Sequence, residues 1–418
     1  MESLKLIGWA AATAIAAAAA LAAAGCTRRG EEIELWTMQL APDFNEYFSK
    51  AIREFERAHP GARVRWTDVP FDAMGQRLVA ASVAGQLPDV LNLNADLLTA
   101  LAKEGRLVDI SREAPAAKSE FLEGAWEAGR VGDGVYALPW YVAVDVLFWR
   151  EDLFTKSGLG EADVPRTFAD LPRVAQALRT KADVFALAPK LGSDSDLLRF
   201  FLMEGAPALR DGEVDFSDAR CGQVASFWAE RFARRECPRS ALTLSHRVGL
   251  DLYIRGEVAM LLSGPQFLQI IQENDPRIAA ATRVAPPMLG AAGVTNLAVM
   301  NVAVSADSPR RERALAFARA LTSAPAQLEF CRTEACFPSA LAALEDPMFT
   351  HPSGEAAARA RAIAVTALRS ARSLVAGLQR QSDAMRLQQI ALQEIVFDGA
   401  PVRDALERAE KATAALAR

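Results

Sequence analysis

Residues 1–25 have the layout of a secretory signal peptide, so the folded protein is built from the chain that follows them. A single cation, Lys5, precedes an apolar run from Leu6 to Ala24, and small residues stand at the end of the run. A charged start, an apolar middle and small residues at the cut site are typical of signal peptides. An uncleaved membrane anchor is the alternative, because the run approaches the length that spans a bilayer. Both interpretations place the rest of the chain outside the cytoplasm.

The segment ends at Cys26. Residues 21–26 (LAAAGC) resemble the signal of bacterial lipoproteins, although Ala23 stands where such signals usually have a branched aliphatic residue. The resemblance implies that Cys26 becomes the acylated first residue of the mature protein. We then expect residues 26–31 to form a short tether to a membrane, with the protein in the periplasm or at the cell surface.

The remaining composition is that of an ordinary soluble globular protein. The chain of 418 residues is 51% hydrophobic and 24% charged, and its formal net charge is -5. This length suggests two or three domain-sized units. A mildly acidic chain without a dense block of Lys and Arg argues against a nucleic-acid partner.

Four cysteines remain once Cys26 is set aside, an even number for an oxidising compartment. The simplest of the three possible pairings is Cys221–Cys237 with Cys331–Cys336, and free buried thiols are the alternative. No CxxC pair occurs and the three histidines are widely separated in sequence, so we expect no metal site and no cofactor.

Periods of two and of about 3.6 residues alternate along the first hundred residues of the chain. Alternation of apolar and polar residues predicts strands, and apolar stripes closed by Gly or Pro predict helices. The predicted strands are 32–38, 62–69 and 88–94, and the predicted helices are 42–59, 71–86 and 96–104. This order predicts an α/β lobe with a largely parallel sheet.

The middle of the chain continues in the same style. Residues 136–149 are extended and contain Pro139, which predicts a strand that crosses between lobes, and Thr167–Asp170 is a capping box that begins a helix to about Thr180. Further predicted helices are 217–232 and 248–255, and further strands are 258–262 and 296–304. Beyond Pro347 we expect almost only helix, ending with the amphipathic run 402–416.

Taken in order, the local motifs resemble the extracellular solute-binding proteins of carbohydrate ABC importers. The segments that carry the resemblance are 33–36 (IELW), 55–61 (FERAHPG), 84–90 (AGQLPDV), 136–139 (YALP), 147–154 (LFWREDLF), 165–171 (PRTFADL), 256–265 (GEVAMLLSGP) and 399–413. Their order and spacing agree with the family over nearly the whole mature chain. The resemblance is specific for the family and does not identify the sugar.

The resemblance implies an α/β fold of the periplasmic-binding-protein type II. Two discontinuous α/β lobes are joined by a hinge, and the ligand cleft lies between them. We expect lobe 1 to contain residues 32–140 and 291–340, and lobe 2 to contain residues 141–290 and 341–418. Ligands of open α/β sheets bind outside the carboxyl ends of the strands, which is where the cleft is expected.

A sugar presents flat C–H faces and rings of hydroxyls, so its site needs aromatic platforms and side chains that donate and accept hydrogen bonds. Residues of these types stand at the predicted strand ends. The predicted ligand-binding residues are Trp36, Gln39, Asn92, Asn94, Asp96, Trp140, Tyr141, Asp145, Gly264, Gln266, Asn296 and Asn301.

Several of these residues also have a purely structural interpretation. Trp36 could belong to the core, and Asn94 and Asp96 could cap the following helix. Trp140 and Tyr141 are consecutive in a strand, so they point to opposite faces unless the chain bends.

The sequence therefore predicts a lipid-anchored binding protein that delivers a carbohydrate to the permease subunits of an importer and catalyses no reaction. We expect it to be a monomer. A membrane-tethered enzyme acting on glycosides and a ligand-sensing receptor subunit are the alternatives. The chain has no G-x-S-x-G, H-E-x-x-H or phosphate-loop motif, but paired carboxylates for glycoside cleavage stay open.

Overall fold

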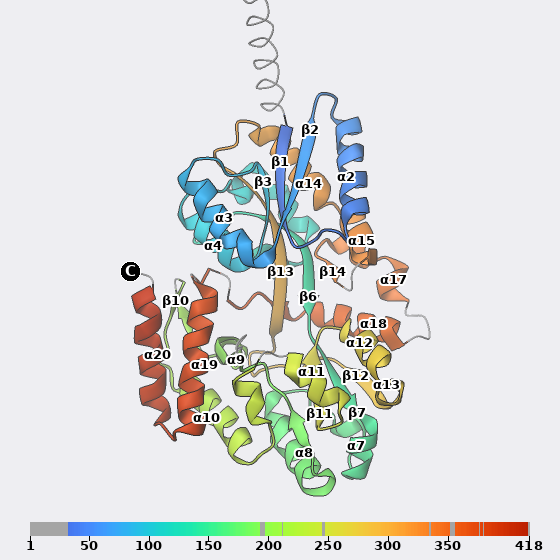
Figure 1. The fold of residues 1–418 in the computed structure, drawn as a ribbon, viewed down its shortest axis with the longest axis vertical. Helices are drawn as coiled ribbons and strands as arrows, with labels where there is room; N and C mark the ends of the chain where they lie inside the picture. Colours follow the sequence, from blue (N-terminus) through green and yellow to red (C-terminus); the bar gives the residue numbers. More distant parts are fainter. Residues whose placement is uncertain are drawn as a thin grey trace, which may run out of the picture. The chain divides into compact units, whose positions relative to one another are not determined.

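Figure 1 shows a computed structural model of the chain. It describes residues 32–192, 197–210, 212–244, 247–333, 336–351, 356–375, 377–378 and 380–416. These residues fall into two compact units. Unit 1 consists of the chain up to Asn92 and of Val304–Leu321, and unit 2 consists of Leu93–Ala303 and of the chain from Thr322 onward.

Unit 1 is built on three parallel strands. The strand β1 (Glu32–Met38) pairs on one side with β2 (Arg63–Val69) and on the other with β3 (Val90–Leu93). The helices α2 (Asn45–Ala58) and α3 (Phe71–Val83) connect these strands. The predicted order of strands and helices in this segment is confirmed, and its strands end at one common edge because they are parallel.

A buried carboxylate joins the two chain segments of unit 1. Asp89, which is 2% exposed, accepts hydrogen bonds from the guanidinium of Arg310 and from the hydroxyl of Ser308. It also accepts the backbone N–H of Glu34 in β1. The helix α14 (Arg311–Leu321) follows directly, and Phe317 of this helix contacts Phe55 of α2.

In unit 2, β6 (Leu138–Val144) lies between two antiparallel neighbours. These are β13 (Thr295–Val304) and β14 (Phe337–Pro338), and the short β15 (Ala371–Arg372) pairs in parallel with β13. A β-bulge at Met300 and Asn301 interrupts the pairing of β13 with β6.

A second sheet of unit 2 has the order β12-β7-β11-β8. Its strands are β7 (Val146–Arg150), β8 (Phe185–Leu187), β11 (Val258–Ser263) and β12 (Thr282–Ala285). The predicted crossing strand 136–149 is thus two strands in two sheets, separated by Asp145. The change of sheet comes at Asp145 rather than at Pro139–Tyr141, because Pro139, Trp140 and Tyr141 all still pair within β6. The boundaries of the two lobes stay a prediction.

The rest of unit 2 is mostly helical. Its helices of eight or more residues are α4 (Ala95–Lys103), α10 (Ala219–Ala233), α11 (Arg247–Ile254), α12 (Phe267–Asn274), α15 (Ala324–Thr333), α18 (Ala356–Leu368), α19 (Gln381–Phe397) and α20 (Val402–Leu416). The shorter helices are α5 (Ile110–Glu113), α6 (Glu123–Glu127), α7 (Glu151–Lys156), α8 (Leu171–Ala177), α9 (Leu197–Met203), α13 (Pro276–Ala281), α16 (Leu341–Leu344) and α17 (Pro347–Thr350). Two pairs of two-residue strands complete the unit: β4 (Arg130–Val131) with β5 (Gly134–Val135), and β9 (Leu209–Arg210) with β10 (Glu213–Val214). α19 and α20 pack side by side (Figure 1).

The predicted capping box is present. Asp170 accepts hydrogen bonds from the backbone N–H and the hydroxyl of Thr167. A 3₁₀ turn (Phe168–Asp170) follows, then α8, then a π-helical turn (Leu178–Ala182). The predicted helix is therefore present with irregular ends.

The four cysteines beyond Cys26 all lie in the described part of the chain, where the structure draws no S–S bond between them. Cys221 and Cys237 lie in the apolar core of unit 2, where burial raises the pKa of both thiols, that of Cys221 to about 12. Cys331 is near the end of α15, and Cys336 follows that helix with its Sγ 3.2 Å from the Sγ of Cys331. Both pairings stay predictions.

The predicted signal peptide and Cys26 lie outside the described residues. Among the described helices, none combines the length and the apolar character that crossing a membrane requires.

Candidate functional site

Trp36 stands near the end of β1 in unit 1 and is almost completely buried, with 6% of its surface exposed. Its indole N–H donates to Glu34 Oε1 at 2.8 Å. The guanidinium carbon of Arg77 lies 4.1 Å from the centre of the ring, which is the geometry of a cation–π contact. The ring is thus held firmly, and one of its faces is already covered by Arg77.

The turn after β1 is shaped by a carboxylate that the sequence analysis did not identify. Asp68 in β2 accepts the backbone N–H groups of Leu40 and Ala41, both at 3.0 Å. It also accepts the hydroxyl of Thr37 at 2.6 Å. These bonds fix the turn that carries Gln39, an exposed residue with the left-handed φ of 51°. Asp68 therefore positions a predicted ligand-binding residue.

At the end of β3, Asn92 is fully buried and its Oδ1 accepts the backbone N–H of Met38 at 3.3 Å. Trp36 and Asn92 thus stand near the carboxyl ends of the neighbouring strands β1 and β3 of unit 1, and Gln39 follows the end of β1.

In unit 2, Asn94 caps α4, because its Oδ1 accepts the backbone N–H of Leu97 at 3.0 Å. The structural interpretation of Asn94 is therefore confirmed. Asp96, in the first turn of the same helix, instead accepts the backbone N–H of Gln381 at 3.2 Å. Burial raises the pKa of the Asp96 carboxyl, and the nearby charge of Asp383 adds to this effect.

Trp140 has no exposed surface. Its ring packs against Phe330 at 4.6 Å between centroids, and Tyr141 stacks on the same Phe330 at 4.9 Å. In this conformation Trp140 is a core residue. Tyr141 keeps part of its surface exposed and is the aromatic of the pair that solvent reaches.

Asp145 forms an ion pair with Lys190, with 2.7 Å between Oδ2 and Nζ. Both side chains are partly exposed, at 33% and 20%. Because Asp145 stands between β6 and β7, this pair ties the junction of the two sheets to the segment after β8.

Two of the remaining predicted residues, Gly264 and Gln266, lie in the turn between β11 and α12, and the other two, Asn296 and Asn301, lie on β13. A Cβ added to Gly264 would meet the amide of Gln266 at 2.2 Å, so glycine leaves room for the exposed Gln266 to fold back over the turn. Asn301 is fully buried at the β-bulge, where its Nδ2 donates to Val299 O at 3.4 Å, and Asn296 is partly buried.

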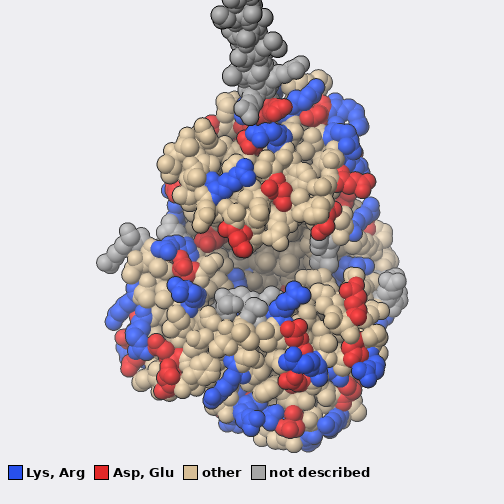
Figure 2. All heavy atoms as spheres, in the orientation of Figure 1, with Lys and Arg blue, Asp and Glu red and all other residues tan. Residues whose placement is uncertain are grey.

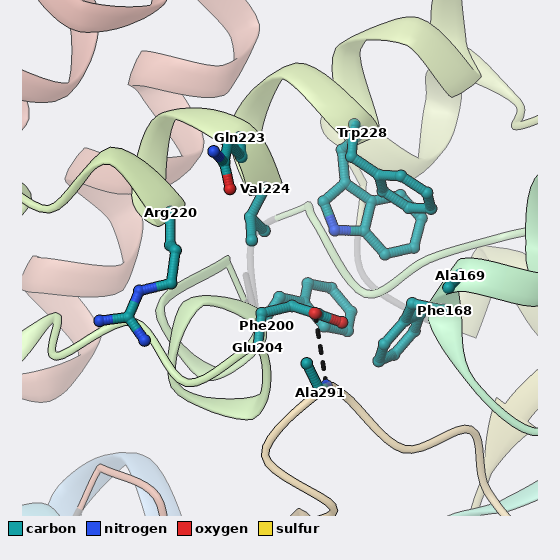
Figure 3. Close-up of a pocket in the computed structure, with 10 residues that line it drawn as sticks. Phe168, Ala169, Phe200, Glu204, Arg220, Gln223, Val224, Trp228 and Ala291 are labelled. Carbon is teal, nitrogen blue, oxygen red and sulfur yellow. Dashed lines mark hydrogen bonds between the residues drawn. The ribbon is translucent and has the colours of Figure 1, made fainter.

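A pocket that the sequence analysis missed lies wholly within unit 2 (Figure 3). Its volume is about 390 Å³. Four aromatic side chains line it together with three polar ones: Phe168, Phe200, Phe227 and Trp228 with Glu204, Arg220 and Gln223. These residues come from the 3₁₀ turn Phe168–Asp170, from α9 and the residue after it, and from α10, so no single sequence motif predicts the pocket.

On the face drawn in Figure 2, Lys and Arg side chains are interspersed with Asp and Glu side chains. Such mixing gives little long-range attraction for a polyanion on this face. Within the described part of the chain, no three His, Cys, Asp or Glu side chains are grouped so that they could hold a metal ion.

Residues 41–328 match the family model of the bacterial extracellular solute-binding proteins. The chain belongs to this family. The family and its fold are those of binding proteins, and the α/β architecture is that of a periplasmic-binding protein of type II.

Individual members of the solute-binding family share the fold and part of the sequence. A periplasmic-binding protein from Synechococcus sp. MITs9220, solved by crystallography, is 30% identical with a TM-score of 0.81, over 91% of this chain and 98% of that one. An uncharacterized lipoprotein of Streptomyces antibioticus is 26% identical over 73% of this chain and 70% of its own length. The multiple sugar-binding protein of Streptococcus mutans is 20% identical over 79% of this chain and 80% of its own length.

Proposed function

We propose that this solute-binding protein captures a carbohydrate outside the cytoplasm and delivers it to the permease subunits of an ABC importer. The observation that carries the proposal is family membership over most of the chain, joined to strand-end side chains of the kinds that sugars need. The Streptococcus relative is named for binding sugars, and the Synechococcus structure is described as that of a candidate oligosaccharide-binding protein.

The binding residues that we propose stand on both units. Gln39 and the buried Asn92 belong to unit 1, and Tyr141, Asp145 and Gln266 belong to unit 2. We propose that binding closes the two predicted lobes on their hinge, because a ligand that touches both walls of a cleft shifts the population toward the closed form. Micromolar affinity corresponds to about -8 kcal/mol, which a few hydrogen bonds and one stacked aromatic supply after the costs of closure.

We further propose that Cys26 is acylated and holds the protein at a membrane as a monomer. The lipoprotein relative from Streptomyces antibioticus supports this localisation. Mass spectrometry of the mature protein from its own envelope should show an acylated amino terminus at Cys26. An intact Met1 start would contradict the proposal.

Uptake of a radiolabelled sugar by cells that lack this protein tests the delivery role. Loss of uptake, restored by the full chain, is the expected result. Normal uptake with loss of a transcriptional response would favour a sensing subunit instead. Release of a product from a glycoside by the purified protein would favour an enzyme.

A further inference from the structure

The pocket of unit 2 has rigid aromatic walls. Trp228 of α10 is 1% exposed, and its ring packs against Phe200 at 4.8 Å and against Phe168 at 5.8 Å between centroids. Both phenylalanines are also buried, at 6% and 4% exposure. Because the three rings hold one another in place, the pocket keeps its shape without a ligand. Flat apolar walls of this kind suit the C–H faces of a ring-shaped ligand.

The indole N–H of Trp228 is a hydrogen-bond donor that faces this pocket. In Figure 3 the indole nitrogen of Trp228 is turned toward the pocket interior. None of the hydrogen bonds of the described residues uses this N–H, although the residue is almost completely buried. Because this N–H is reached from the pocket and is not sealed in the core, an acceptor on a ligand in the pocket can receive it.

Glu204 and Gln223 bring hydrogen-bond acceptors to the same pocket. Glu204 is partly buried, and its Oε2 accepts the backbone N–H of Ala291 at 3.3 Å, which fixes the carboxylate at the pocket (Figure 3). Gln223 is exposed at the rim and offers both a donor and an acceptor. The guanidinium of Arg220 is engaged elsewhere, because it forms two hydrogen bonds with Asp218 and donates to Gly205 O.

The donor and the acceptors together restrict the chemistry of the ligand. An ammonium group has no acceptor for the indole N–H. An anion would lie against the carboxylate of Glu204, while the positive charge of Arg220 is balanced by Asp218. A neutral hydroxyl both donates and accepts, so a hydroxylated ring satisfies the Trp228 and Glu204 groups at once.

We propose that this pocket is a second carbohydrate site, separate from the strand-end residues and contained in unit 2. It binds one neutral sugar ring between Trp228, Phe200 and Glu204. The site is independent of closure, because every residue that lines it belongs to the same unit.

The test uses the full-length protein in detergent, with its tryptophans labelled with ¹⁵N, so that each indole N–H gives one NMR signal. The Trp228→Phe variant identifies the signal of Trp228, since it removes the N–H and keeps an aromatic ring. The probes are D-glucose, maltose and D-mannitol. Trp126→Phe is the matched control, because Trp126 is also buried and lies outside the pocket lining.

We expect at least one probe to shift the Trp228 signal in a saturable manner. Glu204→Gln and Gln223→Ala should each weaken this titration by about 3- to 10-fold, and leave the titration of the other indole signals unchanged. Glu213→Gln, at an exposed glutamate of the same unit, should change neither titration. If Trp228→Phe does not fold, the indole signal of Trp228 is identified as the one whose chemical shift changes in both Glu204→Gln and Gln223→Ala.

A Trp228 signal that stays fixed with all three probes overturns the second site. If the other indole signals titrate in that experiment, the proposed function stands and only the second site fails. A Trp228 signal that titrates together with the others, and is insensitive to Glu204→Gln, also overturns the second site, because it then reports the main site from a distance.

Discussion

The carboxylate of Asp68 accepts the hydroxyl of Thr37 across the neighbouring strands β1 and β2, with 2.6 Å between Oδ1 and Oγ1. The same hydroxyl accepts the indole N–H of Trp66 at 2.7 Å. Since Asp68 also holds the backbone of Leu40 and Ala41, a chain of hydrogen bonds runs from the sheet into the turn that carries Gln39.

Replacing Asp68 by Asn should therefore destabilise unit 1 and weaken ligand binding. Asn keeps the size of the side chain and loses the charged acceptor. We therefore expect the free energy of unfolding, measured in urea, to fall by about 1.5–3 kcal/mol. Asp43→Asn is the control, because Asp43 is exposed in the segment after β1 that also carries Gln39. Equal stability of the two variants would contradict the role of Asp68.

Asp96 should make stability depend on pH. Because the pKa of Asp96 is raised in the folded protein, the folded state binds the proton more tightly than the unfolded one. The contribution of Asp96 to the free energy of unfolding is most favourable below the unfolded pKa of about 3.9. This contribution is lost as the pH rises through the raised pKa of the folded state.

Asp96→Asn removes that dependence and still accepts the backbone N–H of Gln381. We expect the variant to be at least as stable as the natural protein at neutral pH. The difference in the free energy of unfolding between the two proteins should shrink toward pH 4. Urea unfolding at neutral pH and at pH 4 measures this difference. A variant that is less stable at neutral pH would show that the charge itself is needed.

Trp140 and Tyr141 should respond differently to truncation. Trp140→Ala removes a fully buried ring, so a loss of about 3–5 kcal/mol of stability is expected. Tyr141→Ala should leave most of the stability and weaken sugar binding by about 0.5–1.5 kcal/mol, on the scale of one aromatic contact. Calorimetric titration of both variants separates the two effects. Normal binding by Tyr141→Ala would remove this residue from the site.

The cysteines Cys331 and Cys336 are close enough to form a bridge after a small movement, because their sulfurs lie 3.2 Å apart and a disulfide needs about 2.05 Å. Peptide mapping without reductant, on protein from its own envelope, should recover this pair joined. Alkylation of both thiols in the native protein would contradict the pairing.

Hydrophobic periodicity predicted most of the secondary structure, and β1 and α20 have the predicted bounds. It did not locate the break at Asp145, because an apolar run continues through two strands of different sheets. Asn94 was ambiguous for a physical reason, since the same amide oxygen can cap a helix or bind a hydroxyl. Asp68 was missed because its partners stand far away in sequence. The same holds for the pocket around Trp228, which four separate segments build.

Binding of a carbohydrate is the central claim, and isothermal titration of the full-length protein in detergent with a panel of sugars and polyols tests it most directly. We predict that one member of the panel binds with a dissociation constant near the micromolar range, about -8 kcal/mol. A hundredfold excess of that sugar should also raise the stability of the protein by about 2.7 kcal/mol. A protein that is folded and binds no sugar or polyol, but binds an amino acid or a peptide, would contradict the account.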